Sequence, residues 1–398
     1  MNKPPTVSNS FKSRQIEVTE KLTIGLTQFR TLSTSNIFIG NSSTGNSTLT
    51  GTNNFALGLS AGQNLTSGSY NNFIGSYTGT SNTRGSNNNF IGSSAGVLNT
   101  IGNSNNFFGS STGFNNLTGS NNNFFGSGAG QYNIFGNDNN FLGCNTGFAN
   151  TSGSCNNFFG RQAGQNNTTG SFNNFFGVQA GQNNTTGGFN NFLGSSAGLC
   201  NATGSNNNFL GSSAGYSNTQ GNHNNFFGCQ AGRSNTTGCS NNFFGVQAGQ
   251  NNTTGGFNNF LGSGAGGINT AGGNNNFLGN GAGFFNTTGN ANNFLGSGAG
   301  FSNTTGNANN FLGNGAGCTN TIGSNNIAIG NTANVATNSL SGVIAIGTGA
   351  TAQLNNELAI GSATWPLSTV SDVTLTGQVS SVILRLNGSL FRVPIIPV

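Results

Sequence analysis

The chain of 398 residues contains 68 Gly and 35 Phe, and only 4% of its residues are charged, against about 25% in a typical globular domain. One His and five acidic residues leave little for acid–base or metal chemistry, which needs clustered His, Cys, Asp or Glu. The formal net charge of +5 is carried mainly by the two ends, so we expect no nucleic-acid-binding surface, no enzyme activity, no cofactor and no metal site.

Residues 1–36 precede the repetitive part of the chain and are predicted to be an attachment or capping segment. Met1 to Ser10 is polar and lacks the apolar stretch of a secretory signal peptide. Gln15 to Gln28 alternates like a short strand, which we expect to pair with or cap the first coil of the repeats. No run of about 18 apolar residues occurs, so no transmembrane segment is predicted.

Residues 37–361 are a tandem repeat whose units resemble NNFFG-VQAG-QNNTTG-GF. The Gly that ends each NNFxG segment, the anchor glycine, recurs every 17 residues without insertion or deletion, at Gly58, Gly75, Gly92, Gly109, Gly126, Gly143, Gly160, Gly177, Gly194, Gly211, Gly228, Gly245, Gly262, Gly279, Gly296, Gly313, Gly330 and Gly347. A step of 18 residues from Gly40 precedes this series, and a step of 14 residues to Gly361 follows it. A disordered chain such as an FG-repeat nucleoporin has no reason to keep its spacing, whereas in a stacked solenoid one extra residue would displace every later column.

The pattern inside each unit indicates strands and turns. A further Gly follows four residues after the anchor, and usually another ten after it; helices do not tolerate Gly at this density. Gly and Asn accept the positive φ of tight corners, so we interpret the anchors as turn glycines, with Gly58, Gly75, Gly160, Gly245, Gly330 and Gly347 as examples. The sequence therefore predicts an all-β parallel β-solenoid, or β-roll, of 17-residue coils, roughly 80 Å long at about 4.8 Å per coil.

Two neighbouring apolar columns run through the array and point to opposite faces of the strand. The residue before the anchor is Leu, Ile or Phe, and the residue before that is Phe in fifteen consecutive coils: Phe73, Phe90, Phe107, Phe124, Phe141, Phe158, Phe175, Phe192, Phe209, Phe226, Phe243, Phe260, Phe277, Phe294 and Phe311. One column can fill the interior, while the other lies outside unless something covers it. Because fifteen exposed Phe rings would form a patch that monomers avoid, these residues are candidates for the core or an interface. A second copy is the simplest cover, which favours a parallel homotrimer and leaves a dimer open.

Polar columns accompany the apolar ones. The two residues before the Phe are nearly always Asn-Asn, and stacked coils allow identical Asn side chains to form hydrogen-bonded ladders. Thr pairs such as Thr168-Thr169 make a second polar column, and a small residue three after the anchor, such as Ala163, indicates a tight corner against the core.

Residues 362–398 are predicted to form a small β cap. Val382 to Leu386 and Ser389 to Val393 flank Asn387-Gly388, the signature of a hairpin with a type I′ turn.

The last coils carry a different motif, in which Ala replaces the Phe: Ile327-Ala328-Ile329-Gly330, Ile344-Ala345-Ile346-Gly347 and Leu358-Ala359-Ile360-Gly361. This motif resembles the head repeat of trimeric autotransporter adhesins, strongly over 326–361 and in register only over 54–325. The NNFxG runs are also similar to repeats found beside phage and virus tail-fibre modules. The resemblance implies a left-handed parallel β-roll, three chains packed side by side, and a role in attachment. It does not extend to that family's signal peptide, stalk or membrane anchor, and the central coils depart from it by placing Phe where the family has Ala.

Six cysteines occur: Cys144, Cys155, Cys200, Cys229, Cys239 and Cys318. Only Cys144 and Cys229 share a column and no CxxC is present, so we expect neither a zinc site nor disulfides; free thiols fit assembly in a reducing cytosol. His223 is expected to be exposed and inert. N-glycosylation motifs recur, as at Asn167-Thr168-Thr169, and their use depends on the compartment.

These features predict a non-enzymatic structural fibre protein, a trimeric β-roll rod on a virion or cell surface that attaches to a surface receptor or glycan. Two alternatives stay open: a subunit that polymerises end to end into an extracellular filament, and an ice-binding solenoid that uses the Thr column. The second requires a regular Thr face, whereas this column is interrupted, for instance at Ile134-Phe135.

Overall fold

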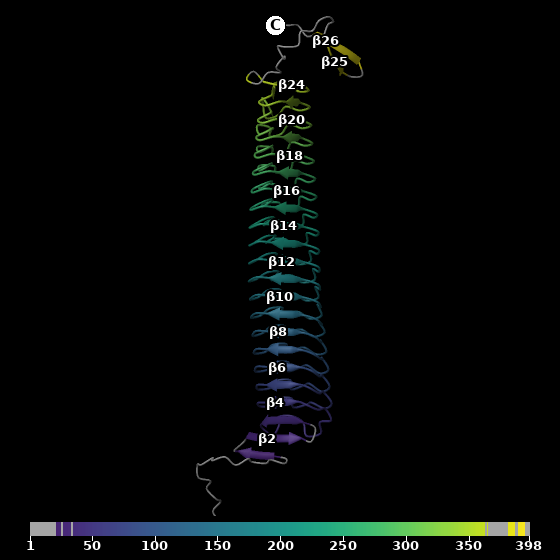
Figure 1. The fold of residues 1–398 in the computed structure, drawn as a ribbon, viewed down its shortest axis with the longest axis vertical. Helices are drawn as coiled ribbons and strands as arrows, with labels where there is room; N and C mark the ends of the chain where they lie inside the picture. Colours follow the sequence, from purple (N-terminus) through teal and green to yellow (C-terminus); the bar gives the residue numbers. More distant parts are fainter. Residues whose placement is uncertain are drawn as a thin grey trace, which may run out of the picture.

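The computed structural model describes residues 21–24, 27–32, 35–362, 364, 381–386 and 389–394. Over 35–362 the chain forms one long rod in which each coil stacks on the previous one (Figure 1). The described residues contain strands and turns and no helix. The prediction of an all-β parallel β-solenoid with 17-residue coils is therefore confirmed.

Each coil contributes one short strand to a sheet of 22 strands. Neighbouring strands of the repeat pair in parallel, with Phe175 opposite Phe192 as an example. The three-residue strands are β4 Phe55–Leu57, β5 Asn72–Ile74, β6 Asn89–Ile91, β7 Asn106–Phe108, β8 Asn123–Phe125, β9 Asn140–Leu142, β10 Asn157–Phe159, β11 Asn174–Phe176, β12 Asn191–Leu193, β13 Asn208–Leu210, β14 Asn225–Phe227, β15 Asn242–Phe244, β16 Asn259–Leu261, β17 Asn276–Leu278, β18 Asn293–Leu295, β19 Asn310–Leu312, β20 Ile327–Ile329, β22 Ile344–Ile346 and β24 Leu358–Ile360. The two-residue strands β21 Asn334–Val335 and β23 Thr351–Ala352 form a small parallel sheet of their own.

The N-terminal end of the rod is covered by antiparallel strands, β1 Lys21–Ile24 and β2 Thr27–Leu32. β2 pairs antiparallel with β1 and with β3 (Asn36–Gly40), and β3 then starts the parallel stack by pairing with β4. The strand that pairs with the first coil is β2, which shares only Thr27 and Gln28 with the strand expected at Gln15 to Gln28, whereas β1 pairs with β2. Residues 15–20 lie outside the described part.

Arg30 of β2 covers the first aromatic ring of the core. Its guanidinium lies 5.7 Å from the ring centroid of Phe38, a cation–π distance, and donates to the backbone carbonyl oxygens of Thr44 and Gly45. Burial lowers the pKa of Arg30 from its ordinary value, yet an arginine keeps its charge at any physiological pH.

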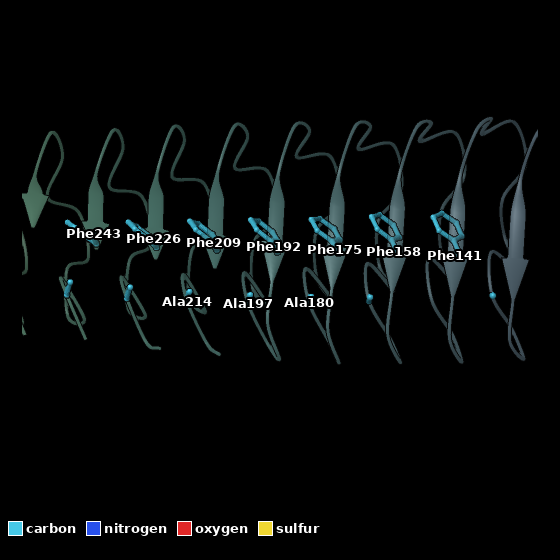
Figure 2. Close-up of a cluster of buried hydrophobic side chains, with 14 of the residues drawn as sticks. Phe141, Phe158, Phe175, Ala180, Phe192, Ala197, Phe209, Ala214, Phe226 and Phe243 are labelled. Carbon is cyan, nitrogen blue, oxygen red and sulfur yellow. The ribbon is translucent and has the colours of Figure 1, made fainter. Parts of the chain in front are cut away.

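The fifteen Phe side chains lie inside the coil, each with no exposed surface. From Phe90 to Phe311 successive ring centroids are 4.7–4.9 Å apart and the ring planes lie within 6° of parallel. Figure 2 shows part of this stack, from Phe141 to Phe243. This spacing equals the distance between stacked strands and produces the offset stacking that aromatic rings prefer. The rings are therefore core residues and cannot form an interface, which was the other role that the sequence left open for them.

Two buried asparagine ladders flank the ring stack. In the first, four residues before each anchor, Asn88 donates its backbone N–H to Oδ1 of Asn71 at 3.0 Å and its side-chain amide to the carbonyl of Gly102. In the second, seven residues after each anchor, Nδ2 of Asn184 donates to Oδ1 of Asn167 at 2.7 Å and to the carbonyl of Gly187 at 2.9 Å. Every buried side-chain nitrogen and oxygen of the described residues has a hydrogen-bond partner, which lets amides fill a core without the usual desolvation penalty.

The coils that carry Ala in place of Phe have a different interior. Ala345 is buried together with Val343, which replaces an Asn of the first ladder, and with Leu340 and Val335. At the other end, the coil of Ala56 also contains the fully buried Leu65, which takes the place of an Asn of the second ladder. Aliphatic side chains from other positions thus occupy the volume that one ring fills in the central coils.

The anchor glycines adopt backbone conformations that exclude a side chain. The φ values of the predicted turn glycines Gly58, Gly75, Gly160, Gly245, Gly330 and Gly347 lie between +119° and +143°. A Cβ at Gly245 would also lie 2.5 Å from the carbonyl oxygen of Gly262 in the next coil. Both the dihedral angle and the close approach of the next coil therefore require Gly at this position.

Near the C-terminus, β25 Ser381–Leu386 and β26 Ser389–Pro394 pair antiparallel, with Leu386 opposite Ser389. This is the hairpin that the sequence predicts; its two turn residues and the remainder of 365–398 lie outside the described part.

Candidate functional site on the outer strand face

The outward face of the sheet carries a continuous apolar column, which we call the outer column. It is formed by the residue before each anchor, whose side chain points away from the Phe stack because adjacent strand residues face opposite ways. Thirteen of its 19 members are 37–48% exposed, with Leu142 and Leu312 among the most exposed, and the other six are less exposed. The outer column comprises Leu57, Ile74, Ile91, Phe108, Phe125, Leu142, Phe159, Phe176, Leu193, Leu210, Phe227, Phe244, Leu261, Leu278, Leu295, Leu312, Ile329, Ile346 and Ile360.

A third asparagine ladder runs beside the outer column on the same face. Nδ2 of each Asn from Asn72 to Asn293 donates to Oδ1 of the Asn in the next coil at 2.7–2.8 Å. In the last coils Ile327, Ile344 and Leu358 replace these Asn, so both outward columns become apolar there. Neither column contains a charged residue, and the face therefore offers apolar contact and neutral amide groups alone.

Stacked aromatic pairs and a hollow shape the surface of the outer strand face. Phe108 and Phe125 stack with centroids 4.8 Å apart, as do Phe159 and Phe176. Leu142 lies between these pairs and is smaller than a Phe, which leaves a hollow of about 450 Å³ bordered by Phe125, Phe159 and the neighbouring Asn side chains. A hollow of this size and lining accommodates an apolar side chain.

The residues that might carry reaction chemistry are dispersed over the rod. The described residues contain no group of three or more His, Cys, Asp or Glu that could hold a metal ion. His223 is exposed at a corner with φ of +57°. All six cysteines are free; Cys144 and Cys229 are exposed, and burial raises the pKa of the Cys200 thiol.

The first Thr of each Thr pair uses its hydroxyl group within the rod. Oγ1 of Thr168 donates to the carbonyl oxygen of Thr185 at 3.0 Å, and Thr253 bonds Thr270 in the same way at 2.9 Å. These side chains stabilise the stacking of coils through side chain–backbone bonds, in place of the side-chain ladder that the Asn columns form.

Sequence reasoning missed two parts of this arrangement. The Asn seven residues after the anchor was not recognised as a buried ladder, although its recurrence from Asn82 to Asn320 marks it as a column. The second is the location of the uncovered apolar surface, which lies on the variable Leu/Ile/Phe column and not on the invariant Phe column.

Within the described ranges no helix is long and apolar enough to cross a membrane. No protein-family model, no curated protein and no solved structure matches the chain.

Proposed function

We propose that this chain is a non-enzymatic structural rod that associates through its outer strand face, as a parallel homotrimer, on the surface of a virion or cell. The observation that carries the proposal is the outer column, an uncharged apolar stripe that extends over the whole solenoid. Soluble monomers rarely expose contiguous apolar surface of this extent.

The area of the stripe is sufficient for a stable interface. Side chains of this size bury about 150–250 Å² when they are aromatic, and less when they are aliphatic. Thirteen of the 19 members of the outer column are 37–48% exposed and the other six are less exposed. At about 150 Å² for a fully exposed side chain, the lower end of the aromatic range, the thirteen alone present on the order of 800 Å². A stable protein–protein interface needs about 800 Å² from each partner.

The distribution of apolar residues favours copies that are parallel and in register. Three identical rods packed side by side around a threefold axis along their length are parallel by symmetry. With no axial shift, the coils in which both outward columns are apolar, such as those of β22 and β24, meet the same coils of the neighbouring copy. A shift would place these residues against the asparagine ladder and leave amide groups facing apolar side chains.

Surface display and attachment to a receptor or glycan are supported by the resemblance of coils 326–361 to adhesin head repeats. The rod form also suits the role, because a solenoid grows in length by adding coils, each of which contacts only its neighbours.

The solution mass, measured by light scattering on a sizing column, tests the proposal. We expect about three times the 40.3 kDa of one chain, and a mass near 40.3 kDa after combining Leu193→Asn, Leu261→Asn and Leu312→Asn in the outer column. The matched control combines Thr169→Asn, Thr254→Asn and Thr305→Asn, which are exposed outside the outer strand face, and should leave the mass unchanged. A wild-type monomer would refute the proposal.

Electron micrographs of discrete rods, as opposed to long filaments, would exclude end-to-end polymerisation.

A further inference from the structure

The second buried ladder coincides with N-glycosylation motifs. In many coils its Asn is followed two residues later by Ser or Thr, which completes the Asn-x-Ser/Thr acceptor sequence. These ladder acceptors are Asn116, Asn150, Asn167, Asn184, Asn201, Asn235, Asn252, Asn286 and Asn303. Acceptor asparagines normally lie on the surface of secreted proteins, whereas every ladder acceptor has no exposed surface at all.

The hydrogen bonds of the ladder use the atom that a glycan would modify. Nδ2 of Asn184 donates one hydrogen to Oδ1 of Asn167 and the other to the carbonyl of Gly187, and Oδ1 of Asn184 accepts from Asn201 at 2.7 Å. In N-glycosylation the C1–Nδ2 bond forms, the bond from C1 to the lipid-linked diphosphate donor breaks, and Nδ2 loses one proton. The modified nitrogen therefore lacks one of its two donors.

The interior also has no space for a sugar. The next coil lies one strand spacing away on either side, at about 4.8 Å, and the Phe stack occupies the centre of each coil. A sugar attached at Asn184 would have to separate coils that are held together by the ladder and by backbone hydrogen bonds.

Other acceptor motifs are located where a glycan is sterically allowed. Asn64, Asn166 and Asn251 each begin an Asn-x-Thr sequence and are exposed. The side chain of Asn166 makes one ladder bond at the surface, to Asn183 at 2.8 Å, and water can replace it. Asn41, Asn46 and Asn183 also begin acceptor motifs and are partly exposed. The described part of the fold thus separates the fully buried ladder motifs from motifs whose Asn reaches the surface.

We propose that the rod forms only from chains whose ladder acceptors are unmodified, so that this protein folds outside any compartment that glycosylates nascent chains. Transfer to Asn takes place on the unfolded chain, before the ladder can protect it. Asn64, Asn166 and Asn251 are exposed acceptors that the folded rod tolerates. The free cysteines also support folding outside such a compartment, because exposed thiols such as Cys144 and Cys229 persist in reducing compartments.

The third residue of each motif allows a clean test. These Ser and Thr side chains lie at the surface, and their hydroxyl groups form no hydrogen bond within the described part of the chain. Other coils have Ala271, Ile101 or Gln220 at the same position, so substitution by Ala is compatible with the fold. The motif-free variant, which lacks the nine ladder motifs and keeps every acceptor motif outside the ladder, combines Thr118→Ala, Ser152→Ala, Thr169→Ala, Thr186→Ala, Thr203→Ala, Thr237→Ala, Thr254→Ala, Thr288→Ala and Thr305→Ala.

The full chain and the motif-free variant would each be expressed in eukaryotic cells, in the cytosol and behind a secretion signal, with all six cysteines changed to Ser to exclude oxidation. We expect both to form protease-resistant rods in the cytosol. In the secretory pathway the full chain should carry glycans that an endoglycosidase removes, and should yield at least tenfold less resistant rod than the motif-free variant. An inhibitor of glycan-precursor synthesis should restore the full chain to the yield of the variant.

Three results would overturn the proposal. The first is a secreted, protease-resistant rod in which mass spectrometry finds glycans on ladder acceptors. The second is a full chain that folds in the secretory pathway with these acceptors unmodified. The third is a motif-free variant that forms rods in the cytosol and fails in the secretory pathway, since glycosylation would then not be the obstacle. As a converse check, Ala271→Thr creates a motif at Asn269 and should lower the secreted yield of the motif-free variant.

Discussion

Gly249 lies against the ring of Phe243 so closely that a Cβ on the glycine would be 2.4 Å from Cε2 of the ring. Its φ of +57° is in the left-handed region, which costs a non-glycine residue about 1–2 kcal/mol, and overpacking a core costs about 1–3 kcal/mol. Gly249→Ala should therefore lower the free energy of unfolding by about 2–5 kcal/mol, measured by chemical denaturation.

Gly298 provides the matched control for this substitution. Its φ is +62°, yet a Cβ there would have nothing within 4 Å. Gly298→Ala should cost only the left-handed conformation, about 1–2 kcal/mol. Equal losses for the two variants would show that contact with the ring does not determine the requirement for Gly.

Phe192 and Leu193 are adjacent in the chain and face opposite sides of the sheet. Phe192 is fully buried and Leu193 is 40% exposed. Phe192→Ala should destabilise the fold by about 3–5 kcal/mol, because it removes one ring from a continuous stack. Leu193→Ala should cost about 1 kcal/mol in stability and should instead weaken self-association. Urea denaturation at low protein concentration and light scattering separate the two effects; a large stability loss for Leu193→Ala in a monomeric chain would place the outer column in the core.

The buried and outward asparagine ladders should respond differently to truncation. Asn184→Ala removes the acceptor for Nδ2 of Asn201 and the donor to Oδ1 of Asn167, and each buried group left unpaired costs about 1–3 kcal/mol. Asn174→Ala breaks bonds to Asn157 and Asn191 on the outward face, where water can replace them, and should cost less than about 1 kcal/mol. Hydrogen exchange of the flanking coils measures both; similar protection in the two variants would contradict the distinction.

The repeat length and the need for Gly were readable from the sequence because a stacked fold repeats its constraints in every coil. The sequence did not show which of the two apolar columns faces the interior, because strand alternation shows only that Phe192 and Leu193 face opposite sides. The deciding contact is the one between each Phe ring and the Gly six residues later, as with Phe243 and Gly249. This contact depends on the path of the corner between them, which no local pattern specifies.

The interior of the end coils could not be predicted from the sequence either. In the sequence, Ala345 of β22 in place of Phe indicates a loss of core volume. Only the structure shows that Leu340, Val343 and Val335 fill the space. These residues are separated along one coil and meet only in its buried cluster, so their compensation is a tertiary effect. The outer strand face was predicted as an uncovered apolar surface, but its residues were identified only once the core was assigned.

Alkylation should distinguish the cysteines by their surroundings. Burial raises the pKa of Cys200 above its ordinary 9.0, so at neutral pH less of it is in the reactive thiolate form. Iodoacetamide, followed by mass spectrometry, should modify Cys200 more slowly than the exposed Cys144. The rate at Cys200 should still be increasing as the pH passes 9. A rate that levels off below that pH would contradict the effect of burial.

The Thr column should not bind ice. Oγ1 of Thr253 donates to the carbonyl oxygen of Thr270, so the hydroxyl hydrogen of the first Thr in each pair is engaged within the rod and is not a free donor to water. The neighbouring outward position is Thr in some coils but Arg84, Phe135 and Ile322 in others, which breaks the regular spacing that an ice lattice requires. At high protein concentration we expect no thermal hysteresis and no change in ice-crystal shape. Hysteresis that increases with protein concentration, and that is lost when Thr169, Thr186 and Thr254 are changed to Lys, would establish the ice-binding function in place of the structural one.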